Sequence, residues 1–487
     1  MLKFFRILLA VISFAAVTIL FLDTTGYAAS HWAWMARIQF VPALLALNVA
    51  VLVGLLLVTL LVGRVYCSVI CPLGIWQDAA NRVGTALSGK RKRRAGRFGF
   101  RRQALRWRTG FLTVFAVLFV AGVFTALPLW LASAMDPYGI FGRSVTAWRW
   151  MPAMTGSATG IVVIFVVAAT FITVTLMAFT RGRDYCNKVC PVGTLLGLVS
   201  RHAVLRPVID TDKCNGCGQC ARHCKASCID PKAHAIDLSR CVVCMDCIEV
   251  CTQKAISFGP KRTKAPAPVA DKPADEGRRA FLTGGAVLGA GLAFDVLAKT
   301  DGGLAPLKRK KASHSAGPLV PAGAQGVRHL TSACTTCQLC ITHCPNGVLH
   351  PSTRLEGLMQ PEMSFNDGWC RTDCTVCGDV CPTDAIASLT VAEKSSIKIG
   401  TAVVDLNTCI SAHDGVHCGS CARHCPAGAI DMVPVREGSG RLRPLVDVNA
   451  CIGCGSCEYH CPVGRVASLP GDTAAIHVEA IDVHRFI

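Results

Sequence analysis

Residues 214–224 read CNGCGQCARHC, and residues 241–251 repeat the spacing as CVVCMDCIEVC. Two runs of the form Cys-x2-Cys-x2-Cys-x3-Cys are typical of a bacterial two-cluster ferredoxin. Three thiolates of one run and the last thiolate of the other hold each [4Fe–4S] cube. The spacing therefore assigns one cube to Cys214, Cys217, Cys220 and Cys251, and the second to Cys241, Cys244, Cys247 and Cys224.

Four further cysteine runs follow, at 334–344, 370–381, 409–425 and 451–461. The second of them has three residues between its first two cysteines and the third has eight, where two is usual. Each run still supplies four thiols, so 24 cysteines predict six [4Fe–4S] cubes. The cysteines of these four runs are Cys334, Cys337, Cys340, Cys344, Cys370, Cys374, Cys377, Cys381, Cys409, Cys418, Cys421, Cys425, Cys451, Cys454, Cys457 and Cys461.

A second repeat surrounds the cysteine runs. An aspartate stands four residues before a first cysteine and an isoleucine follows a last one, at Asp210, Asp237, Asp405, Asp447, Ile256, Ile386 and Ile430. We interpret these positions as short strands that flank the cluster loops. The fold class expected for this part is α+β, built from ferredoxin repeats in a two-cluster module and then a four-cluster module.

Four long apolar segments precede the repeats, at 4–22, 41–62, 111–132 and 159–180. The chain of 487 residues is 52% hydrophobic and only 17% charged. Since about 20 apolar residues cross a bilayer as a helix, these segments predict an N-terminal four-helix transmembrane bundle. Arg6 is the single charged residue among them, and we expect it to reach the lipid interface.

The formal net charge of +19 follows the same membrane pattern. Twelve lysines and arginines lie between Arg64 and Arg108, whereas the other loops between the apolar segments carry few. By the positive-inside rule, both ends of the bundle face the cytoplasm. The basic balance therefore indicates membrane topology and contact with lipid, and we expect no nucleic-acid partner.

Two Cys-x3-Cys-Pro pairs follow the second and fourth apolar segments, which the expected topology puts at one membrane face. Four converging thiols could form a metal, cluster or redox site, while the alternative is a set of buried thiols at helix ends. These residues are Cys67, Cys71, Cys186 and Cys190. Cys228 is left over from all motifs and is expected to be a packed thiol.

The chain divides into four parts by composition. Residues 1–200 form the membrane domain, 201–258 the cytoplasmic two-cluster module, 259–330 a linker, and 331–487 the four-cluster module. Within the linker, the pair Arg278-Arg279 opens a mildly apolar stretch over about 278–298 that resembles a twin-arginine export signal. The four-cluster module is therefore expected in the periplasm of a bacterial inner-membrane protein.

Other cofactors find little support in the sequence. No histidine lies within the apolar segments and no Cys-x-x-Cys-His occurs, so we expect no haem. No nucleotide-binding glycine motif follows a strand, so we expect no flavin. A quinone site is not visible as a motif, and Asp136 and Tyr138 are weak candidates for it. Histidines that precede a fourth cluster cysteine could tune cluster potentials or stand exposed, at His223, His343, His424 and His460.

Taken together, residues 1–258 resemble the NapH/MauN type of membrane iron–sulfur protein, and residues 278–487 resemble their NapG/MauM-type partners. The resemblance implies a fusion of the two that acts as a quinol dehydrogenase, with membrane quinol as donor and a periplasmic redox protein or terminal reductase as acceptor. It also implies that, in the four-cluster module, the first run pairs with the fourth and the second with the third. The fourth ligands of the four cubes would then be, in order, Cys461, Cys425, Cys381 and Cys344.

Two other functions stay open at this level. One is a metal reductase or maturation factor that uses the two Cys-x3-Cys-Pro pairs on a metal such as copper. The other is an electron-wire subunit that has no substrate of its own.

Overall fold

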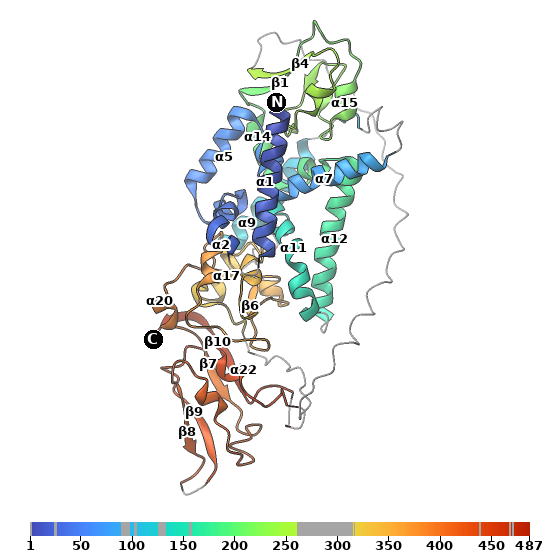
Figure 1. Cartoon of the computed structure of the whole chain (residues 1–487). Coiled ribbons are helices and arrows are strands. Elements are labelled where there is room, and N and C mark those ends of the chain that lie inside the picture. Colours follow the sequence, from blue (N-terminus) through green and yellow to red (C-terminus); the bar gives the residue numbers. More distant parts are fainter. Residues whose placement is uncertain are drawn as a thin grey trace.

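The computed structural model describes residues 2–23, 27–88, 98–101, 105–124, 133–154, 158–260, 315, 317–437, 440–466, 469 and 472–487. A helical domain lies in the middle of the molecule, with the two-cluster module at one end and the four-cluster module at the other (Figure 1). The Arg278-Arg279 pair and the whole 278–298 stretch lie outside the described residues, so the twin-arginine signal stays a prediction.

Among the described residues, the helical domain has two helices that are long and apolar enough to cross a membrane, α1 and the Gly160–Arg181 part of α12. They correspond to the first and fourth apolar segments of the sequence. The helices of this domain are α1 (Leu2–Leu22), α2 (Tyr27–Trp32), α3 (Trp34–Arg37), α4 (Phe40–Leu45), α5 (Val49–Val62), α6 (Tyr66–Val69), α7 (Pro72–Leu87), α9 (Leu105–Phe124), α11 (Pro137–Met154), α12 (Ala158–Arg181), α13 (Asp184–Lys188) and α14 (Pro191–Ser200).

The second apolar segment is not one helix. The chain breaks between α4 and α5, where Leu47 has a φ of 50° and the Asn48 side chain accepts a hydrogen bond from the N–H of Val51 at 3.2 Å. Asn48 is an N-cap, and the 14 residues that follow it span only about 21 Å, less than the hydrocarbon core. Counting apolar residues missed this cap because asparagine carries no charge.

The third apolar segment begins as helix α9, and its described part ends at Phe124. Arg6 also departs from expectation: only 9% of it is exposed, and it contacts the carbonyl of Ser68 at 3.4 Å and the carboxylate of Asp78 at 3.6 Å. Since a buried guanidinium needs acceptors, Arg6 is held inside the protein and does not reach the lipid interface. Four spans remain a prediction, of which two meet the length requirement.

The two-cluster module is built on short antiparallel strand pairs. β1 (Leu205–Ile209) pairs with β4 (Ile256–Pro260), and β2 (Ile229–Asp230) pairs with β3 (Ala235–Ile236). One short helix follows the first cysteines of each run, α15 (Gln219–His223) and α16 (Asp246–Val250). The strands lie where the flanking Asp and Ile positions predicted them.

The flanking aspartates shape the turns that lead into the cluster loops. The Asp237 side chain accepts a hydrogen bond from the N–H of Ser239, and the Cys241 N–H donates to the Asp237 carbonyl at 3.1 Å. Asp405 and Asp447 make the same backbone contact to the cysteine four residues on. Such Asx turns reverse the chain at the end of a strand, which explains why the aspartate recurs.

The four-cluster module repeats this plan. Its antiparallel strand pairs are β5–β6, β8–β9 and β7–β10. Ile386 is the exception to the flanking-strand prediction, since the neighbouring Ala387 N–H donates instead to the carbonyl of Gly323. The elements are η1 (Ala322–Ala324), α17 (Val327–Ala333), α18 (Leu339–Thr342), β5 (Leu349–Pro351), η2 (Leu355–Gly357), β6 (Pro361–Met363), α19 (Val376–Asp379), α20 (Val391–Ser395), β7 (Ile397–Val404), α21 (Ser420–Arg423), β8 (Ile430–Pro434), β9 (Leu442–Val446), α22 (Ser456–Tyr459) and β10 (Ile476–Phe486).

One apolar core joins the helical domain to the four-cluster module. It runs from Phe21 and Phe141 of the helical domain to Leu339 and Ile341, which belong to the loop of the first cysteine run in the four-cluster module. The two-cluster module has a smaller core of its own, and so do the third and fourth runs of the four-cluster module. The loop of the first cysteine run is therefore packed directly on the helical domain.

Candidate functional site

The two-cluster module brings each predicted set of four cysteines together. Burial, together with Cys214, Cys217 and Cys251 close by, raises the pKa of the Cys220 thiol. The second set surrounds a cavity of about 410 Å³ between the two halves of the module. Its four cysteines all line that cavity, and they are Cys224, Cys241, Cys244 and Cys247.

Cys228 is closer to this second set than the sequence suggested. Its side chain is buried and lines the same cavity, with its sulfur 3.5 Å from that of Cys224. Hydrogen bonds with Cys224 and Cys241 raise its pKa well above the ordinary value. Cys228 therefore lies against the sulfurs of the second cluster site, which is more than the inert packing that the sequence predicted.

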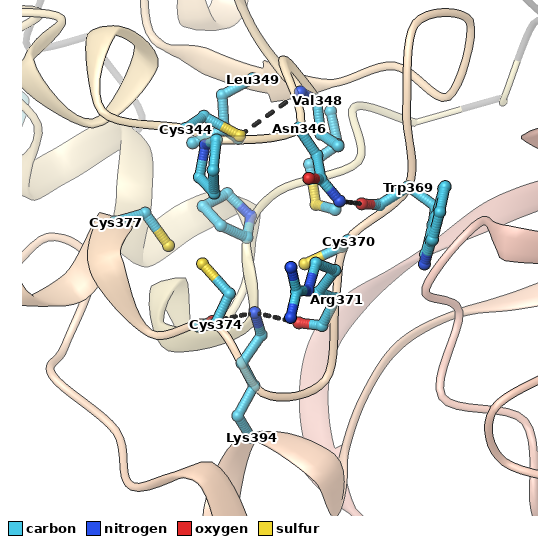
Figure 2. Close-up of a pocket in the computed structure, with 13 residues that line it drawn as sticks. Cys344, Asn346, Val348, Leu349, Trp369, Cys370, Arg371, Cys374, Cys377 and Lys394 are labelled. Atoms are coloured by element: carbon cyan, nitrogen blue, oxygen red, sulfur yellow. Dashed lines mark hydrogen bonds between the residues drawn. The ribbon is translucent and has the colours of Figure 1, made fainter. Parts of the chain in front are cut away.

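In the four-cluster module the pairing implied by the resemblance is wrong. A cavity of about 410 Å³ is lined by the first three cysteines of the second run together with Cys344 of the first run (Figure 2). Burial raises the pKa of the Cys377 thiol to about 12, with Cys370, Cys344 and Cys374 adding to the effect. This cluster site therefore consists of Cys344, Cys370, Cys374 and Cys377.

The other three sites of this module follow the same rule of adjacent pairing. Cys381 lies with the first run, since burial raises the pKa of the Cys340 thiol well above its ordinary value and Cys334, Cys337 and Cys381 add to the effect. Cys461 lines a cavity with Cys409, Cys418 and Cys421. Burial raises the pKa of Cys454 in the fourth run, and Cys425 adds to the effect, so Cys425 lies near that run. The chain thus pairs run one with two and three with four, and the β8–β9 hairpin joins the third run to the fourth.

These sites fit [4Fe–4S] cubes by their donor chemistry. Backbone N–H groups point at sulfurs four residues earlier, at 3.3 Å from Ala255 to Cys251, from Val348 to Cys344 and from Ala429 to Cys425. Such donors stabilise thiolate charge. Sets of four converging thiols with such donors suit [4Fe–4S] clusters.

Lys394 balances charge beside the Cys344 site. Its ammonium donates to the carbonyls of Arg371, at 2.7 Å, and Cys374 (Figure 2). Burial alone would lower the pKa of Lys394, but Cys370, Cys377 and Cys374 raise it above the ordinary value. A permanent positive charge at this position offsets part of the negative charge of four thiolates.

The four histidines that precede fourth cysteines share one local role. The Nδ1 atoms of His223 and His343 lie 3.0 Å from the carbonyl oxygen four residues earlier, and His424 and His460 repeat this at 2.8 and 2.9 Å. Each ring therefore caps the short helix behind its cluster loop. His424 and His460 also stack on each other, with ring centroids 3.9 Å apart.

The two Cys-x3-Cys-Pro pairs also come together, and we call Cys67, Cys71, Cys186 and Cys190 the four-thiol site. Each of the four side chains is only 3–4% exposed. Burial raises the pKa of Cys67 to about 11. The nearby Arg64 lowers this pKa, and Cys186 raises it further. The pKa values of Cys71 and Cys190 are also raised, by burial and then by Cys186.

A longer repeat than the one first noticed builds this site. Residues 63–74 and 182–193 both read Gly-Arg-x-Tyr-Cys-x3-Cys-Pro-x-Gly. The last glycine is required, because a Cβ at Gly74 would lie 2.2 Å from the Cys67 carbonyl oxygen, and one at Gly193 equally close to that of Cys186. The last cysteine of each copy is the N-cap of a helix with proline in its first turn.

The arginines of the repeat cross between its two copies. Arg183 donates to the carbonyl of Cys67 at 2.8 Å, and Arg64 donates to the carbonyl of Gly193 at 2.7 Å. Arg64 also donates to the carbonyl of Cys241, a cysteine of the two-cluster module, at 3.4 Å. The four-thiol site is therefore tied directly to the second cluster site of that module.

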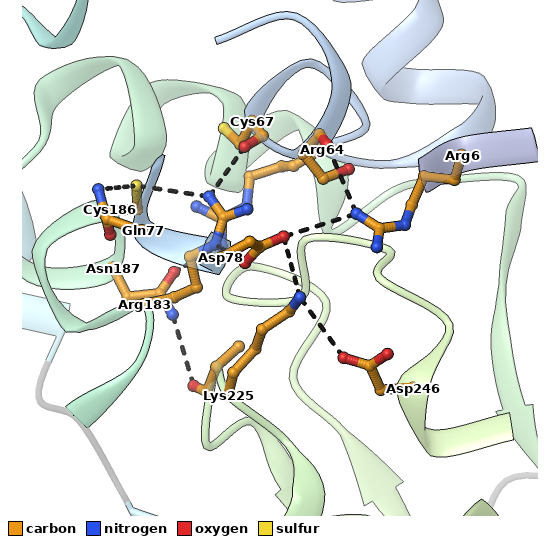
Figure 3. A network of polar contacts seen from close by, with 12 residues as sticks. Arg6, Arg64, Cys67, Gln77, Asp78, Arg183, Cys186, Asn187, Lys225 and Asp246 are labelled. Atoms are coloured by element: carbon orange, nitrogen blue, oxygen red, sulfur yellow. Dashed lines mark hydrogen bonds and ion pairs between the residues drawn. The ribbon is translucent and has the colours of Figure 1, made fainter. Parts of the chain in front are cut away.

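A buried ion network surrounds this junction (Figure 3). The Asp78 carboxylate contacts Arg183 at 2.8 Å, Lys225 at 2.9 Å and Arg6 at 3.6 Å. Burial alone would raise the pKa of Asp78, but Arg183 and Lys225 hold it far below its ordinary value. Lys225 follows a cluster cysteine and also contacts Asp246 at 3.4 Å, so the network joins the helical domain to the two-cluster module.

Asp136 and Tyr138, the two residues that the sequence suggested for a quinone site, lie at the start of α11. The Asp136 carboxylate accepts hydrogen bonds from the N–H groups of Gly139 at 2.7 Å and Tyr138 at 3.3 Å, which makes it a helix N-cap. Burial raises the pKa of Asp136 to about 6. The Tyr138 side chain is buried, and its pKa is raised well above normal by burial and by nearby Cys337.

Two tyrosines lie between the four-thiol site and this loop. The Tyr185 hydroxyl donates to the carbonyl of Met135 at 3.2 Å. The pKa of Tyr185 is raised by burial, by Cys190 and Cys186, and by Asp136. That of Tyr66 is raised by burial, by Cys71 and by Asp136, so both rings lie near the four-thiol site and near Asp136. Sequence reasoning missed both tyrosines, although the repeat carries them at equivalent positions.

Comparison with known proteins agrees with the cysteine sites. Residues 44–94 and 162–209 match a family described as a 4Fe-4S binding domain, and these two segments contain the whole four-thiol site. Residues 207–230 match another 4Fe-4S binding domain family, and residues 416–465 match a 4Fe-4S dicluster domain family. No solved structure matches the chain.

Among curated proteins, the ferredoxin-type protein NapG of Escherichia coli is 31% identical over 193 residues, which are 36% of this chain and 78% of NapG. This chain belongs to the NapH/MauM-type family of ferredoxin-type proteins. NapH of Escherichia coli is 28% identical over 225 residues, covering 45% of this chain and 69% of NapH. The methylamine utilization protein MauM of Methylobacillus flagellatus is 33% identical over 158 residues, covering 30% of this chain and 65% of MauM. Another curated relative is matched over only 33% of its length.

Proposed function

We propose that this NapH/MauM-type protein is a membrane-bound quinol dehydrogenase that passes electrons from quinol to a periplasmic redox acceptor. Iron–sulfur electron transfer is the established part of this statement, from the matched 4Fe-4S families and ferredoxin-type relatives. Six [4Fe–4S] cubes and a further cluster at the four-thiol site would supply one-electron transfer when bound.

The observation that carries the proposal is the unbroken order of sites through the helical domain. The second cluster site of the two-cluster module contacts Arg64 of the four-thiol site through the Cys241 carbonyl. Tyr185 then links that site to Met135, next to Asp136. On the far side, a Cβ at Gly142 of α11 would lie 2.6 Å from the carbonyl of Cys337, a residue of the first cluster site of the four-cluster module.

This order supports a role of the four-thiol site as the link between the two modules. Without it, the two sets of clusters would lie too far apart for exchange across the hydrocarbon core, which is about 30 Å thick. Arg64 and Arg183 supply the positive charge that four buried thiolates require. The burial of all four thiols also disfavours the metal-reductase alternative, because a metal substrate must reach its site from solvent.

Helix α1 supports placing the two modules on opposite sides of the membrane. Its 21 residues span about 31 Å, which matches a bilayer core. At one end Lys3 contacts Asp246 of the two-cluster module at 2.9 Å. At the other end, burial lowers the pKa of His343 in the four-cluster module and the charge of Asp23 raises it, so the two residues are near each other. With the basic 64–108 loop in the cytoplasm, the four-cluster module would lie in the periplasm.

The test is anaerobic reduction of the purified protein in detergent by a short-tail ubiquinol or menaquinol, followed by electron paramagnetic resonance of the reduced clusters. We expect quinol to reduce part of the clusters that dithionite reduces, with one quinone formed for every two electrons. If dithionite reduces the clusters but neither quinol does, the protein is an electron-wire subunit and the proposed dehydrogenase role is wrong.

A further inference from the structure

A second kind of cavity lies between the membrane helices and the four-cluster module. It is partly open to the surface and, unlike the cysteine-lined cavities, contains no cysteine. Its walls come from α11, from the candidate membrane helix α12, and from two loops of the four-cluster module, with Thr336 on one loop and Leu358 and Met359 on the other. Its lining is mostly apolar with a few polar side chains, which is the composition typical of small-molecule sites.

The cavity opens on the outer face of α12. Val166, Val167 and Thr170 of that helix line it, and Val166 is 47% exposed. The neighbouring Phe165 is 71% exposed, so this face of the helix is apolar and uncovered by protein. If α12 crosses the membrane, as its length allows, this is the face that meets lipid. A ligand could then enter from the bilayer with an apolar tail remaining outside.

The inner end of the cavity is polar and buried. Arg143 is 6% exposed, and its guanidinium donates to the Thr336 hydroxyl at 2.5 Å and to the Ser133 carbonyl at 3.1 Å. A guanidinium carries five N–H donors in a planar fork, so it can bind a further oxygen atom beside those of Thr336 and Ser133. A ligand carbonyl or hydroxyl at this end would take up a remaining donor.

Thr336, which accepts the hydrogen bond from Arg143, connects the cavity to a cluster site. The N–H of Thr336 donates to the Cys334 sulfur at 3.4 Å, while its hydroxyl accepts from Arg143. Cys334 belongs to the first cluster site of the four-cluster module. A ligand bound to Arg143 would therefore be separated from the Cys334 sulfur by a single residue, Thr336. Asp136 flanks the arginine, since Asp136 Oδ2 and Arg143 Nη1 each lie 3.1 Å from the point that a Cβ on Gly139 would occupy.

We propose that this cavity binds the head group of a membrane quinone, with a head-group oxygen on Arg143 and the isoprenoid tail along the exposed face of α12. The assignment rests on the proposed function, and it names the site at which quinol meets the protein. Oxidation of one quinol releases two electrons and two protons. The electrons go singly to the clusters of the proposed function, and the protons go to water. A lipid acyl chain would use the apolar wall but would leave the buried Arg143 without a new acceptor.

The test is photolabelling of the purified protein with a short-tail azidoquinone, in competition with unlabelled decylubiquinone, and peptide mapping by mass spectrometry. We expect label on peptides from residues 134–144 or 336–359. Thr170→Phe fills the cavity from α12 and should weaken competition by decylubiquinone about tenfold or more. Thr173→Phe, on an exposed part of the same helix that does not line the cavity, should bind as the unchanged protein does. Arg143→Gln should also weaken binding.

Iron content close to that of the unchanged protein shows that each variant is folded. If Thr170→Phe and Arg143→Gln both bind decylubiquinone normally, the cavity is not the quinone site. If labelling is displaced by phospholipid but not by decylubiquinone, the cavity is a lipid site and the proposal is wrong. Either result leaves quinol-driven cluster reduction in the unchanged protein untouched, so failure of this site can be told apart from failure of the proposed function.

Discussion

The ferredoxin loops and the four-thiol site hold their cysteines in opposite ways. In the loops, Cys214 is partly and Cys217 fully exposed, and the bonds that shape the loop are local, such as that from the Cys217 N–H to the Asn215 side chain at 3.2 Å. In the four-thiol site every sulfur is buried, and the arginine of one repeat copy binds the backbone of the other. The loops are therefore local units, whereas the four-thiol site exists only when the helical domain is assembled.

The largest expected effect follows from the close glycine of the four-thiol site. Gly193→Ala would put a Cβ 2.2 Å from the Cys186 carbonyl oxygen, so backbone must move. We expect a loss of about 5 kcal/mol in unfolding free energy, or no folded protein at all. Gly54→Ala in α5 is the control, because nothing lies within 4 Å of its added Cβ. Thermal unfolding in detergent measures both, and equal stability of the two variants would remove the steric argument.

The buried ion network should come next. Asp78→Asn leaves Arg183, Lys225 and Arg6 without their carboxylate, which should cost about 3 kcal/mol. Asp373→Asn changes an exposed carboxylate and should have little effect.

The network also predicts a pH dependence. The pKa of Asp78 is depressed in the folded protein, so its contribution is present above the unfolded value of about 3.9 and is lost as the pH falls below it. Unfolding temperatures between pH 7 and pH 3 should therefore fall at the acid end for the unchanged protein and less for Asp78→Asn. A parallel fall in both proteins would show that other carboxylates dominate.

The pairing of cluster loops can be tested by iron content. Cys344 and Cys377 belong to one site in the structure, so changing both to Ser should remove one cube, or about four iron atoms. If the first run paired with the fourth and the second with the third, the same double change would damage two cubes and remove about eight. Anaerobic iron analysis of the double variant distinguishes the two arrangements directly.

The smallest expected effect is at Cys228. Its thiol lies 3.5 Å from the Cys224 sulfur but is a neighbour of the cluster site and not one of its four ligands. Cys228→Ala should leave the iron content unchanged. It should shift the electron paramagnetic resonance signal of the second cluster of the two-cluster module and of no other cluster. Loss of about four iron atoms would instead make Cys228 a ligand.

The cluster loops could be predicted from the sequence because their structure is local. Spacing alone predicted which cysteines the two-cluster module brings together, and the aspartates marked the strand ends. The pairing within the four-cluster module depends on which loops pack together, a tertiary property that spacing does not encode. For the same reason Arg6 was expected at the lipid interface, while Asp78, 72 residues away, holds it inside.

The four-thiol site could be predicted only in outline. The duplicated Cys-x3-Cys-Pro pairs indicated that four thiols converge, and the longer repeat from Gly63 to Gly74 adds the arginine, tyrosine and glycine that position them. The contact of Arg64 with Cys241, and that of Tyr185 with Met135, joins residues 50 or more positions apart. No local pattern predicts such contacts, yet they are what makes the site a candidate link between modules.

The most direct test of that link is quinol-driven reduction of the Cys71→Ser, Cys190→Ser double variant. Val69→Ser with Lys188→Ser changes equivalent positions of the same two loops and keeps all four thiols, so it is the matched control. Electron paramagnetic resonance after rapid freezing follows the clusters, and the signals of the two-cluster module are identified by their change in Cys217→Ser. We predict that the cysteine double variant keeps the iron of the six cubes and still reduces the four-cluster module, while reduction of the two-cluster module is blocked. Reduction of both modules at the rate of the control would contradict the account and make the four cysteines structural.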